Sequence, residues 1–435
     1  MKYMKILTIV GICAVLVAAG CSDRGTNVPT TTDRSSWTVI PDLNHVFVPP
    51  PAASGNPSQL LMQIRNPGGI LQMSAYVPYP DLVPFDEKYQ GKPLPVVILL
   101  APQDADKSFF FNHGLNEVAY ELISTGTIRP MIIVAIGNDQ WFGGTFYGNS
   151  IPAGHMDDVM GSRFVDFIDS RFIASWADAD TTRMGISGFG MGSYGAFRAL
   201  LKHPGIYKSI AVTDGPLDFD GTTGNGGLKA LIPSVFAEQG LRTDTTWEYV
   251  ANNFDTAKTW PISRMFTGAA LAFSPHDTAM DVAVAVIGRE TREIRINTRF
   301  QFGDSTTLVS TLLQGRELGL LSDQADVHYG FHLPFDQTMA VYTPTWDRWM
   351  ANNLDVLMGD GSALDDVPMW FGTTPQAEFG YHDMTTGWIN TLRTSGHDPI
   401  VYQYSGTLSH PATSNAYTYY LLREMLIFHS NALGE

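Results

Sequence analysis

The chain has 435 residues, 44% of them hydrophobic and 16% charged, and this composition excludes a disordered or collagen-like protein. Asp and Glu number 43 against 27 Lys and Arg, so the formal net charge is −16. Because phosphate binding needs concentrated positive charge and the chain has no basic run, we expect no nucleic-acid partner. The two cysteines, Cys13 and Cys21, both lie near the start, which excludes a disulfide framework.

The first segment has the features of a targeting signal. Lys2 and Lys5 precede a mostly apolar, uncharged run over 6–19, which is shorter than the roughly 20 residues that span a bilayer. Small residues then precede Cys21, a pattern that resembles the lipobox of bacterial lipoproteins. The resemblance implies cleavage before Cys21 and a lipid anchor on its sulfur. Ser22 after it implies the outer membrane of the cell envelope, with its periplasmic or surface side left open. An ordinary secretory signal or a short anchor is the alternative.

The rest of the chain divides by composition and periodicity. We expect a signal peptide over 1–20, the lipidated cysteine with a Ser-, Thr- and Pro-rich flexible tether over 21–58, and a globular domain over 59–435. In this domain, short apolar runs alternate with segments of helical spacing, which predicts an α/β fold with a mostly parallel sheet and helices on both faces. The predicted strands lie at 95–100, 131–136, 182–186, 209–212, 369–371 and 400–404, and the predicted helices at 115–123, 159–172, 191–201, 384–393 and 417–428. Residues from about 215 to 366 interrupt this alternation before the last two strands. They are predicted to form a large insertion, placed to cover the carboxyl edge of the sheet.

The turn between the predicted strand at 182–186 and the helix at 191–201 is rich in glycine. A nucleophile elbow places a small residue two positions before and two positions after its nucleophile, on a strained strand-to-helix turn. Gly188 and Gly192 satisfy this spacing only when the pattern is centred on Gly190. Centring on Ser187 or Ser193 puts a bulky residue at a small position. The nucleophile position is therefore occupied by a residue with no side chain.

Several motifs around this turn resemble the esterase D / feruloyl-esterase-like branch of the α/β-hydrolases. The resemblance covers residues 70–220 and 366–432, and it implies an α/β-hydrolase fold with an ester-hydrolase ancestry. The family's elbow is usually Gly-x-Ser-Met-Gly-Gly, so Gly190 stands where its serine belongs. The motifs are Phe146-Tyr-Gly-Asn-Ser150, Gly154-His-Met-Asp-Asp158, Phe164-Val-Asp-Phe-Ile-Asp169, Gly188-Phe-Gly-Met-Gly192, Tyr194-Gly-Ala-Phe-Arg198 and His203-Pro204.

The resemblance also implies positions for the other catalytic groups. His410, after the last predicted strand, fits the general base. The acid belongs after the preceding strand, where the family's aspartate position falls near Pro375, so Glu378 or Asp383 is the candidate. The oxyanion N–H groups would come from Met191 and, because proline has no N–H, from Gln103.

Without a nucleophile, covalent acyl transfer cannot proceed. We therefore expect an esterase-like lipoprotein whose serine chemistry has lapsed and which keeps a binding or scaffold role, so that as a carboxylic-ester hydrolase it is inactive or impaired. The alternative is an active hydrolase of carbohydrate or phenolic esters that uses an unconventional nucleophile or a water activated by His410. The expected partners are the membrane, through Cys21, and a small ester or carbohydrate ligand.

Three weaker patterns complete the sequence reading. Gly188-x-Gly190-x-x-Ser193, with Asp214 downstream, leaves a dinucleotide-binding protein as a remote alternative. The spacing of His328 and His332 resembles a metal pair, but Gly330 argues against a helix there, and we expect neither a metal nor a cofactor. The remaining pattern is aromatic, and it fits an aromatic cleft or, more simply, core packing: Phe109-Phe110-Phe111, Trp141-Phe142, Trp346 and Trp349.

Overall fold

The protein is described by a computed structural model. It describes residues 39–40, 59–66, 69–78, 87–89, 91–138, 144–150, 154–169, 179–221, 226–256, 260–279, 283–287, 290–294, 308–314, 325–404 and 415–434. The predicted signal peptide with Cys21, most of the predicted tether and His410 lie outside these residues. Within the described ranges, every helix is too short or too polar to cross a lipid bilayer.

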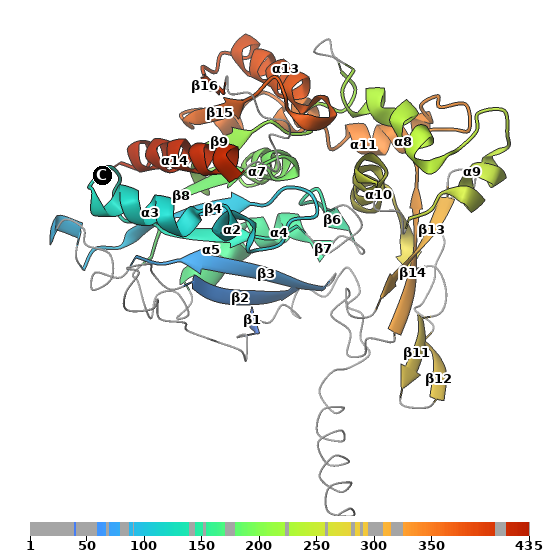
Figure 1. The fold of residues 1–435 in the computed structure, drawn as a ribbon, viewed down its shortest axis with the longest axis horizontal. Coiled ribbons are helices and arrows are strands. Elements are labelled where there is room, and N and C mark those ends of the chain that lie inside the picture. The colour runs from blue at the N-terminus through green and yellow to red at the C-terminus, as the bar shows by residue number, and fades with distance from the viewer. Residues whose placement is uncertain are drawn as a thin grey trace, which may run out of the picture.

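A nine-stranded, mixed sheet forms the centre of the molecule (Figure 1). Strands β1, β2 and β3 pair antiparallel and join β5 antiparallel, whereas all pairings from β5 through β4, β8, β9 and β15 to β16 are parallel. In spatial order the strands are β1 (Val39–Ile40), β2 (Gln59–Asn66), β3 (Gly69–Tyr76), β5 (Ile132–Ile136), β4 (Leu94–Leu100), β8 (Ala179–Gly188), β9 (Tyr207–Thr213), β15 (Met369–Thr373) and β16 (Ile400–Gln403).

Helices cover both faces of this sheet, because the central strands are apolar on both sides. In β4, Val96, Ile98 and Leu100 pack into one core cluster, while Val97 and Leu99 pack into the other. This alternation follows from the two-residue period of a strand. The first cluster is covered by α4 (Met156–Met160), α5 (Ser162–Asp169), α7 (Met191–Lys202) and α13 (Tyr381–Thr394), and the second by α2 (Phe109–Asn112), α3 (Leu115–Ser124) and α14 (Asn415–Ala432).

The predicted insertion separates β9 from β15. It contains helices and a second, antiparallel sheet that Figure 1 shows beside α9 and α10, apart from the central sheet. Its helices are α8 (Ile232–Gln239), α9 (Trp247–Asn253), α10 (Pro261–Phe273), α11 (Thr343–Met350) and α12 (Leu354–Met358). Its strands are β10 (Pro275–Ala279), β11 (Ala283–Ile287), β12 (Glu290–Ile294), β13 (Leu308–Gln314) and β14 (Ala325–His332). A short hairpin, β6 (Asn149–Ser150) with β7 (Gly154–His155), precedes α4.

These elements confirm the predicted α/β-hydrolase fold, with a mostly parallel sheet, helices on both faces and an insertion before the last two strands. The single helix predicted over 159–172 is wrong. The chain forms α4 and α5 instead, with a turn at Gly161 between them. A Cβ at Gly161 would lie 2.6 Å from the ring of His203, so the two helices meet where only a glycine lets that ring approach.

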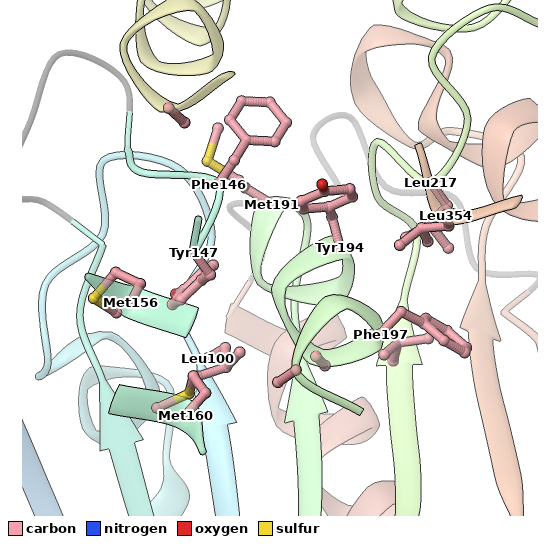
Figure 2. Packing of buried hydrophobic residues seen from close by; sticks show 14 of the residues in the cluster. Leu100, Phe146, Tyr147, Met156, Met160, Met191, Tyr194, Phe197, Leu217 and Leu354 are labelled. Carbon is pink, nitrogen blue, oxygen red and sulfur yellow. The ribbon is translucent and has the colours of Figure 1, made fainter. Parts of the chain in front are cut away.

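The helix that follows the elbow lies in the larger core cluster. Met191, Tyr194 and Phe197 of α7 point into it, and Phe146 and Tyr147 lie beside them (Figure 2). The Tyr194 ring lies 5.5 Å from that of Phe146 in an edge-to-face arrangement. Packing on this face therefore fixes the start of α7, and with it the turn that precedes the helix.

Candidate functional site

Gly190 lies at the turn between β8 and α7, with φ 53° and ψ −118°. Residues with a side chain rarely adopt a positive φ of this kind, and such strained positions cluster at functional turns. The neighbouring glycines are fixed by close backbone contacts. A Cβ at Gly188 would lie 2.0 Å from the carbonyl oxygen of Gly192, and one at Gly192 would lie 2.1 Å from that of Leu100. The turn therefore has the strand-turn-helix geometry of an elbow.

The two serines that flank the elbow point elsewhere. Oγ of Ser187 lies 2.7 Å from Nε2 of His429, in the core on the face covered by α14. Oγ of Ser193 donates to the carbonyl oxygen of Gly188 at 2.9 Å, and the backbone N–H of Thr213 donates to it at 3.2 Å. Both hydroxyls are fully buried and already hydrogen-bonded. Both hydroxyls therefore serve hydrogen bonds within the core.

A cleft of about 220 Å³ opens at Gly190. Its walls come from the loop after β4, the elbow, the end of β9, the start of α10, the segment after β15 and the start of α14. The insertion reaches the cleft through Pro261, the first residue of α10. The lining residues are Pro102, Gln103, Asp104, Ala105, Phe109, Phe189, Gly190, Met191, Thr213, Asp214, Pro261, Thr374, Ala377, Glu378, Phe379, Tyr381, Tyr417 and Thr418.

Both candidate oxyanion residues line this cleft with Gly190. Met191 is the first residue of α7, so its N–H belongs to the unpaired set at a helix N-terminus. The side-chain Nε2 of Gln103 donates to the carbonyl oxygen of Pro261 at 2.9 Å, which ties the loop after β4 to α10. Pro102 of the same loop closes over the elbow, since a Cβ at Gly190 would lie 3.3 Å from the Pro102 Cβ.

The two candidate acids are placed differently. Glu378 is half-buried and lines the cleft, whereas Asp383 is exposed on α13 and is not among the lining residues. The structure thus brings Gly190, Met191, Gln103 and Glu378 to one cleft. The base candidate, His410, cannot be located, because it lies outside the described residues.

Asp214 is a cleft residue that sequence reasoning did not assign to an esterase site. It follows β9 directly, it is 6% exposed, and its Oδ2 accepts a hydrogen bond of 2.6 Å from the backbone N–H of Thr374. Its other oxygen, Oδ1, lies 3.7 Å from Nδ1 of His382 on α13. The feature of the sequence that could have identified Asp214 is its position directly after a buried strand, because ligands bind at that edge of a parallel sheet.

The environment raises the pKa of both Asp214 and His382. Burial raises the pKa of the Asp214 carboxyl, because the charged form loses its hydration. The Asp214 carboxylate in turn raises the pKa of the His382 imidazole. Asp214 and His382 therefore form a titratable pair, in which Asp214 is buried in the cleft wall and His382 is partly exposed on α13.

Of the remaining sequence patterns, the described residues other than Phe109 do not line the cleft. Trp346 and Trp349 stack on α11 with ring centroids 5.9 Å apart and are buried in the core, while Phe109 alone of the three consecutive phenylalanines lines the cleft. Trp141 and Phe142 lie outside the described residues. His328 and His332 belong to strand β14, and no group of three or more His, Cys, Asp or Glu among the described residues could hold a metal ion.

Comparison with known proteins finds a family similar to part of this chain. Residues 82–261 match the family model described as "Putative esterase". No curated protein matches the sequence significantly. Among solved structures, the chain is similar to a ferulic acid esterase, at 12% identity and a TM-score of 0.45, over 86% of this chain and 98% of that one. It is also similar to an S-formylglutathione hydrolase from Agrobacterium tumefaciens, at 13% identity and a TM-score of 0.46, over 88% and 98% of the two chains. Residues 82–261, which carry the Gly190 elbow and Asp214, are therefore similar to the esterase family, and the sheet around them has the α/β-hydrolase topology.

Proposed function

We propose that this protein is an esterase-family descendant that binds a small ligand in the Gly190 cleft and no longer forms an acyl-enzyme. One observation carries the proposal. The elbow keeps its strained geometry, but Gly190 supplies no nucleophile, and no serine or cysteine is found among the described residues that line the cleft. The family's serine-based acyl transfer needs such a side chain at the elbow, whereas binding in a preformed, largely apolar cleft does not.

The position of Pro102 supports the same proposal. Its Cβ lies where it would press on any side chain at Gly190, and it removes one backbone N–H from the loop that would supply an oxyanion donor. The close contact at the Gly190 position and the missing N–H of Pro102 both act against ester hydrolysis at the elbow. A small ester or carbohydrate as the ligand, as expected from the sequence, stays a prediction.

Ester turnover tests the proposal against its alternative, hydrolysis by a water that His410 activates. The full-length protein and His410→Ala are compared with 4-nitrophenyl acetate at pH 7.5. We expect both proteins to hydrolyse the ester at the rate of buffer alone. Turnover by the parent that disappears in His410→Ala would support the alternative and reject a lapsed esterase.

We further propose that the domain is held in the bacterial cell envelope by a lipid on Cys21. The apolar run, the small residues before Cys21 and the polar segment after it support this localisation. Metabolic labelling with an alkyne-tagged palmitate in a Gram-negative host checks it, with Cys21→Ala as the variant and Cys13→Ala as the matched control. We expect label on the parent and on any mature Cys13→Ala protein, and none on Cys21→Ala. Equal labelling of Cys21→Ala would contradict the anchor.

A further inference from the structure

Residues 102–104 of the loop after β4, here called the flap, line the cleft beside the elbow. Backbone hydrogen bonds fix the residue on either side of the flap. The N–H of Ala101 donates to the carbonyl oxygen of Ile136 at 3.0 Å, and the N–H of Asn138 donates to that of Ala105 at 2.7 Å. The flap is therefore a short segment with two fixed ends, whose middle borders the cleft.

Two side chains of the flap contact the first turn of α10. Nε2 of Gln103 donates to the carbonyl oxygen of Pro261 at 2.9 Å. The guanidinium of Arg264 donates to both carboxylate oxygens of Asp104, through Nε–H at 3.0 Å and through a second N–H. A two-point pair of this kind fixes the orientation of the carboxylate as well as its distance. The insertion therefore holds the middle of the flap by two side-chain contacts.

These contacts hold the flap in a conformation that its own backbone disfavours. Asp104 has a φ of 58°, in the left-handed region that residues with a side chain rarely adopt. Such positions persist only where surrounding contacts hold them. Pro102, at the start of the flap, lies against the elbow, where a Cβ at Gly190 would be 3.3 Å from its own Cβ. Loss of the contacts with α10 therefore removes what keeps the flap in its strained position against the elbow.

Helix α10, by contrast, is firmly anchored at the end that holds the flap. One carboxylate oxygen of Glu238, on α8, accepts from the backbone N–H and the hydroxyl of Ser263, at 2.6 and 2.7 Å. Its other oxygen accepts from the N–H of Ile262 at 3.2 Å. These bonds satisfy N–H groups that a helix N-terminus leaves unpaired, and the next turn buries Met265 and Phe266 in the larger core cluster. The helix is therefore a fixed support for the flap.

We propose that Arg264 sets the size of the ligand that the Gly190 cleft admits, by holding the flap against the elbow. This inference rests on the proposed binding function and names what selects its ligand. With the flap held, the cleft has a volume of about 220 Å³ and admits a small molecule, and with the flap released it admits larger ones. Arg264 is thus a positioning residue, which acts on the ligand through Asp104. The two side chains of this pair are 23% and 38% exposed, so salt in the solvent weakens their attraction.

Two maleimides that share a reactive group and differ in size test this limit. Thr213→Cys places a thiol at the end of β9, at a buried position that lines the cleft. The full-length protein reacts with N-ethylmaleimide or fluorescein-5-maleimide, its intact mass gives the rates, and the parent gives the background of the native cysteines. The exposed Ser395→Cys provides the ratio of the two rates at free access. We expect the large reagent to be slower at Thr213→Cys by a further factor of about ten or more.

Variants made in the Thr213→Cys protein assign the limit to the flap. Arg264→Gln removes the charged contact between α10 and the flap. We expect fluorescein-5-maleimide to react about fivefold faster in this variant, and N-ethylmaleimide to stay within about twofold. Arg242→Gln breaks an exposed ion pair elsewhere in the insertion, so it is the matched control and should leave both rates unchanged. Ala377→Cys, on the segment after β15, is a second cleft reporter should Thr213→Cys fold poorly.

Three results would overturn the inference. The first is an unchanged rate of the large reagent in Arg264→Gln and in Arg264→Gln combined with Gln103→Ala. The second is an equal rise with both reagents, because a general loosening of the protein does not select by size. The third concerns salt: about 0.5 M NaCl should speed the large reagent when Arg264 is present, and an equal effect of salt in Arg264→Gln would contradict the role of the ion pair.

The result is separable from the proposed function, because thiol modification needs neither ester chemistry nor the natural ligand. Ester turnover by the parent would reject the lapsed esterase, whatever the two maleimides show. A silent parent whose cleft thiol reacts with both reagents in the ratio of the exposed site would leave a binding protein and reject only the size limit.

Discussion

Oγ of Ser187 lies 2.7 Å from Nε2 of His429, and Nδ1 of the same ring lies 2.7 Å from Oγ of Ser209. This serine-histidine pair is fully buried between α14 and the sheet, and none of the three residues lines the cleft. A neutral imidazole has one donor and one acceptor, so it satisfies both hydroxyls while it remains uncharged. The three residues therefore tie α14 to β8 and β9 through two buried hydrogen bonds.

The buried His429 predicts a loss of stability in mild acid. Burial lowers its pKa to about 3, whereas in the unfolded chain the pKa is 6.5. Below pH 6.5 His429 binds a proton in the unfolded state but not in the folded state, which lowers the free energy of unfolding. This loss is absent above pH 6.5 and increases as the pH falls to about 3. At pH 5 the loss in the free energy of unfolding that is due to His429 amounts to about 2 kcal/mol.

Urea unfolding at pH 7.5 and at pH 5 measures this effect, with His429→Gln as the reference. We expect the parent to lose about 2 kcal/mol more than His429→Gln over this interval. An equal loss of unfolding free energy in both proteins would contradict a lowered pKa of His429 in the folded state.

A serine at the elbow should destabilise the protein. Gly190→Ser places a side chain at φ 53° and brings its Cβ to 3.3 Å from Pro102, so we expect a loss of about 1–3 kcal/mol in the free energy of unfolding. Gly205→Ser is the control, because Gly205 also has a positive φ but has open space around its Cβ position. If Pro102 contributes, Gly190→Ser with Pro102→Gly will be more stable than the sum of the single changes predicts. Strict additivity would show that Pro102 does not press on the new side chain.

The flanking glycine at 192 should tolerate no side chain at all. Gly192→Ala puts a Cβ 2.1 Å from the carbonyl oxygen of Leu100, and backbone cannot move aside as a flexible side chain can. We expect a loss of more than about 4 kcal/mol or failure to fold. Gly126→Ala, at a positive φ with nothing within 4 Å, should cost about 1 kcal/mol. Similar thermal midpoints for the two variants would contradict the tight strand-to-helix turn.

The helix that starts at the elbow is held by a buried ion pair. Both Nε and a terminal nitrogen of Arg198 on α7 lie 2.6 Å from the carboxylate oxygens of Asp157, and the side chains of both residues are nearly buried. Removing one partner leaves a buried charge, so Asp157→Ala should cost about 3–5 kcal/mol. Asp244→Ala breaks an exposed pair with Arg242 and should leave the urea midpoint unchanged. Equal effects of the two substitutions would show that burial does not decide the strength of these pairs.

The local parts of the site were predictable from the sequence, and the long-range parts were not. Strand β4, helix α7 and the turn at Gly190 follow from apolar runs and glycine spacing within about 20 residues, and the structure has them where the patterns predict. The contact of Asp214 with His382 joins two segments far apart in the chain, and no periodicity carries that information. The same holds for Pro261 of α10 at the cleft, because its position depends on how the insertion folds back over the sheet.

The most direct test of the central claim asks whether the cleft contains any nucleophile. The full-length protein is incubated with a fluorophosphonate, and its intact mass is then measured, with Gly190→Ser alongside. We expect the parent to show no added mass, because neither Gly190 nor the described cleft offers a serine. A phosphonyl adduct on the parent, mapped to a cleft residue, would contradict the account and show that the esterase chemistry persists through a different side chain.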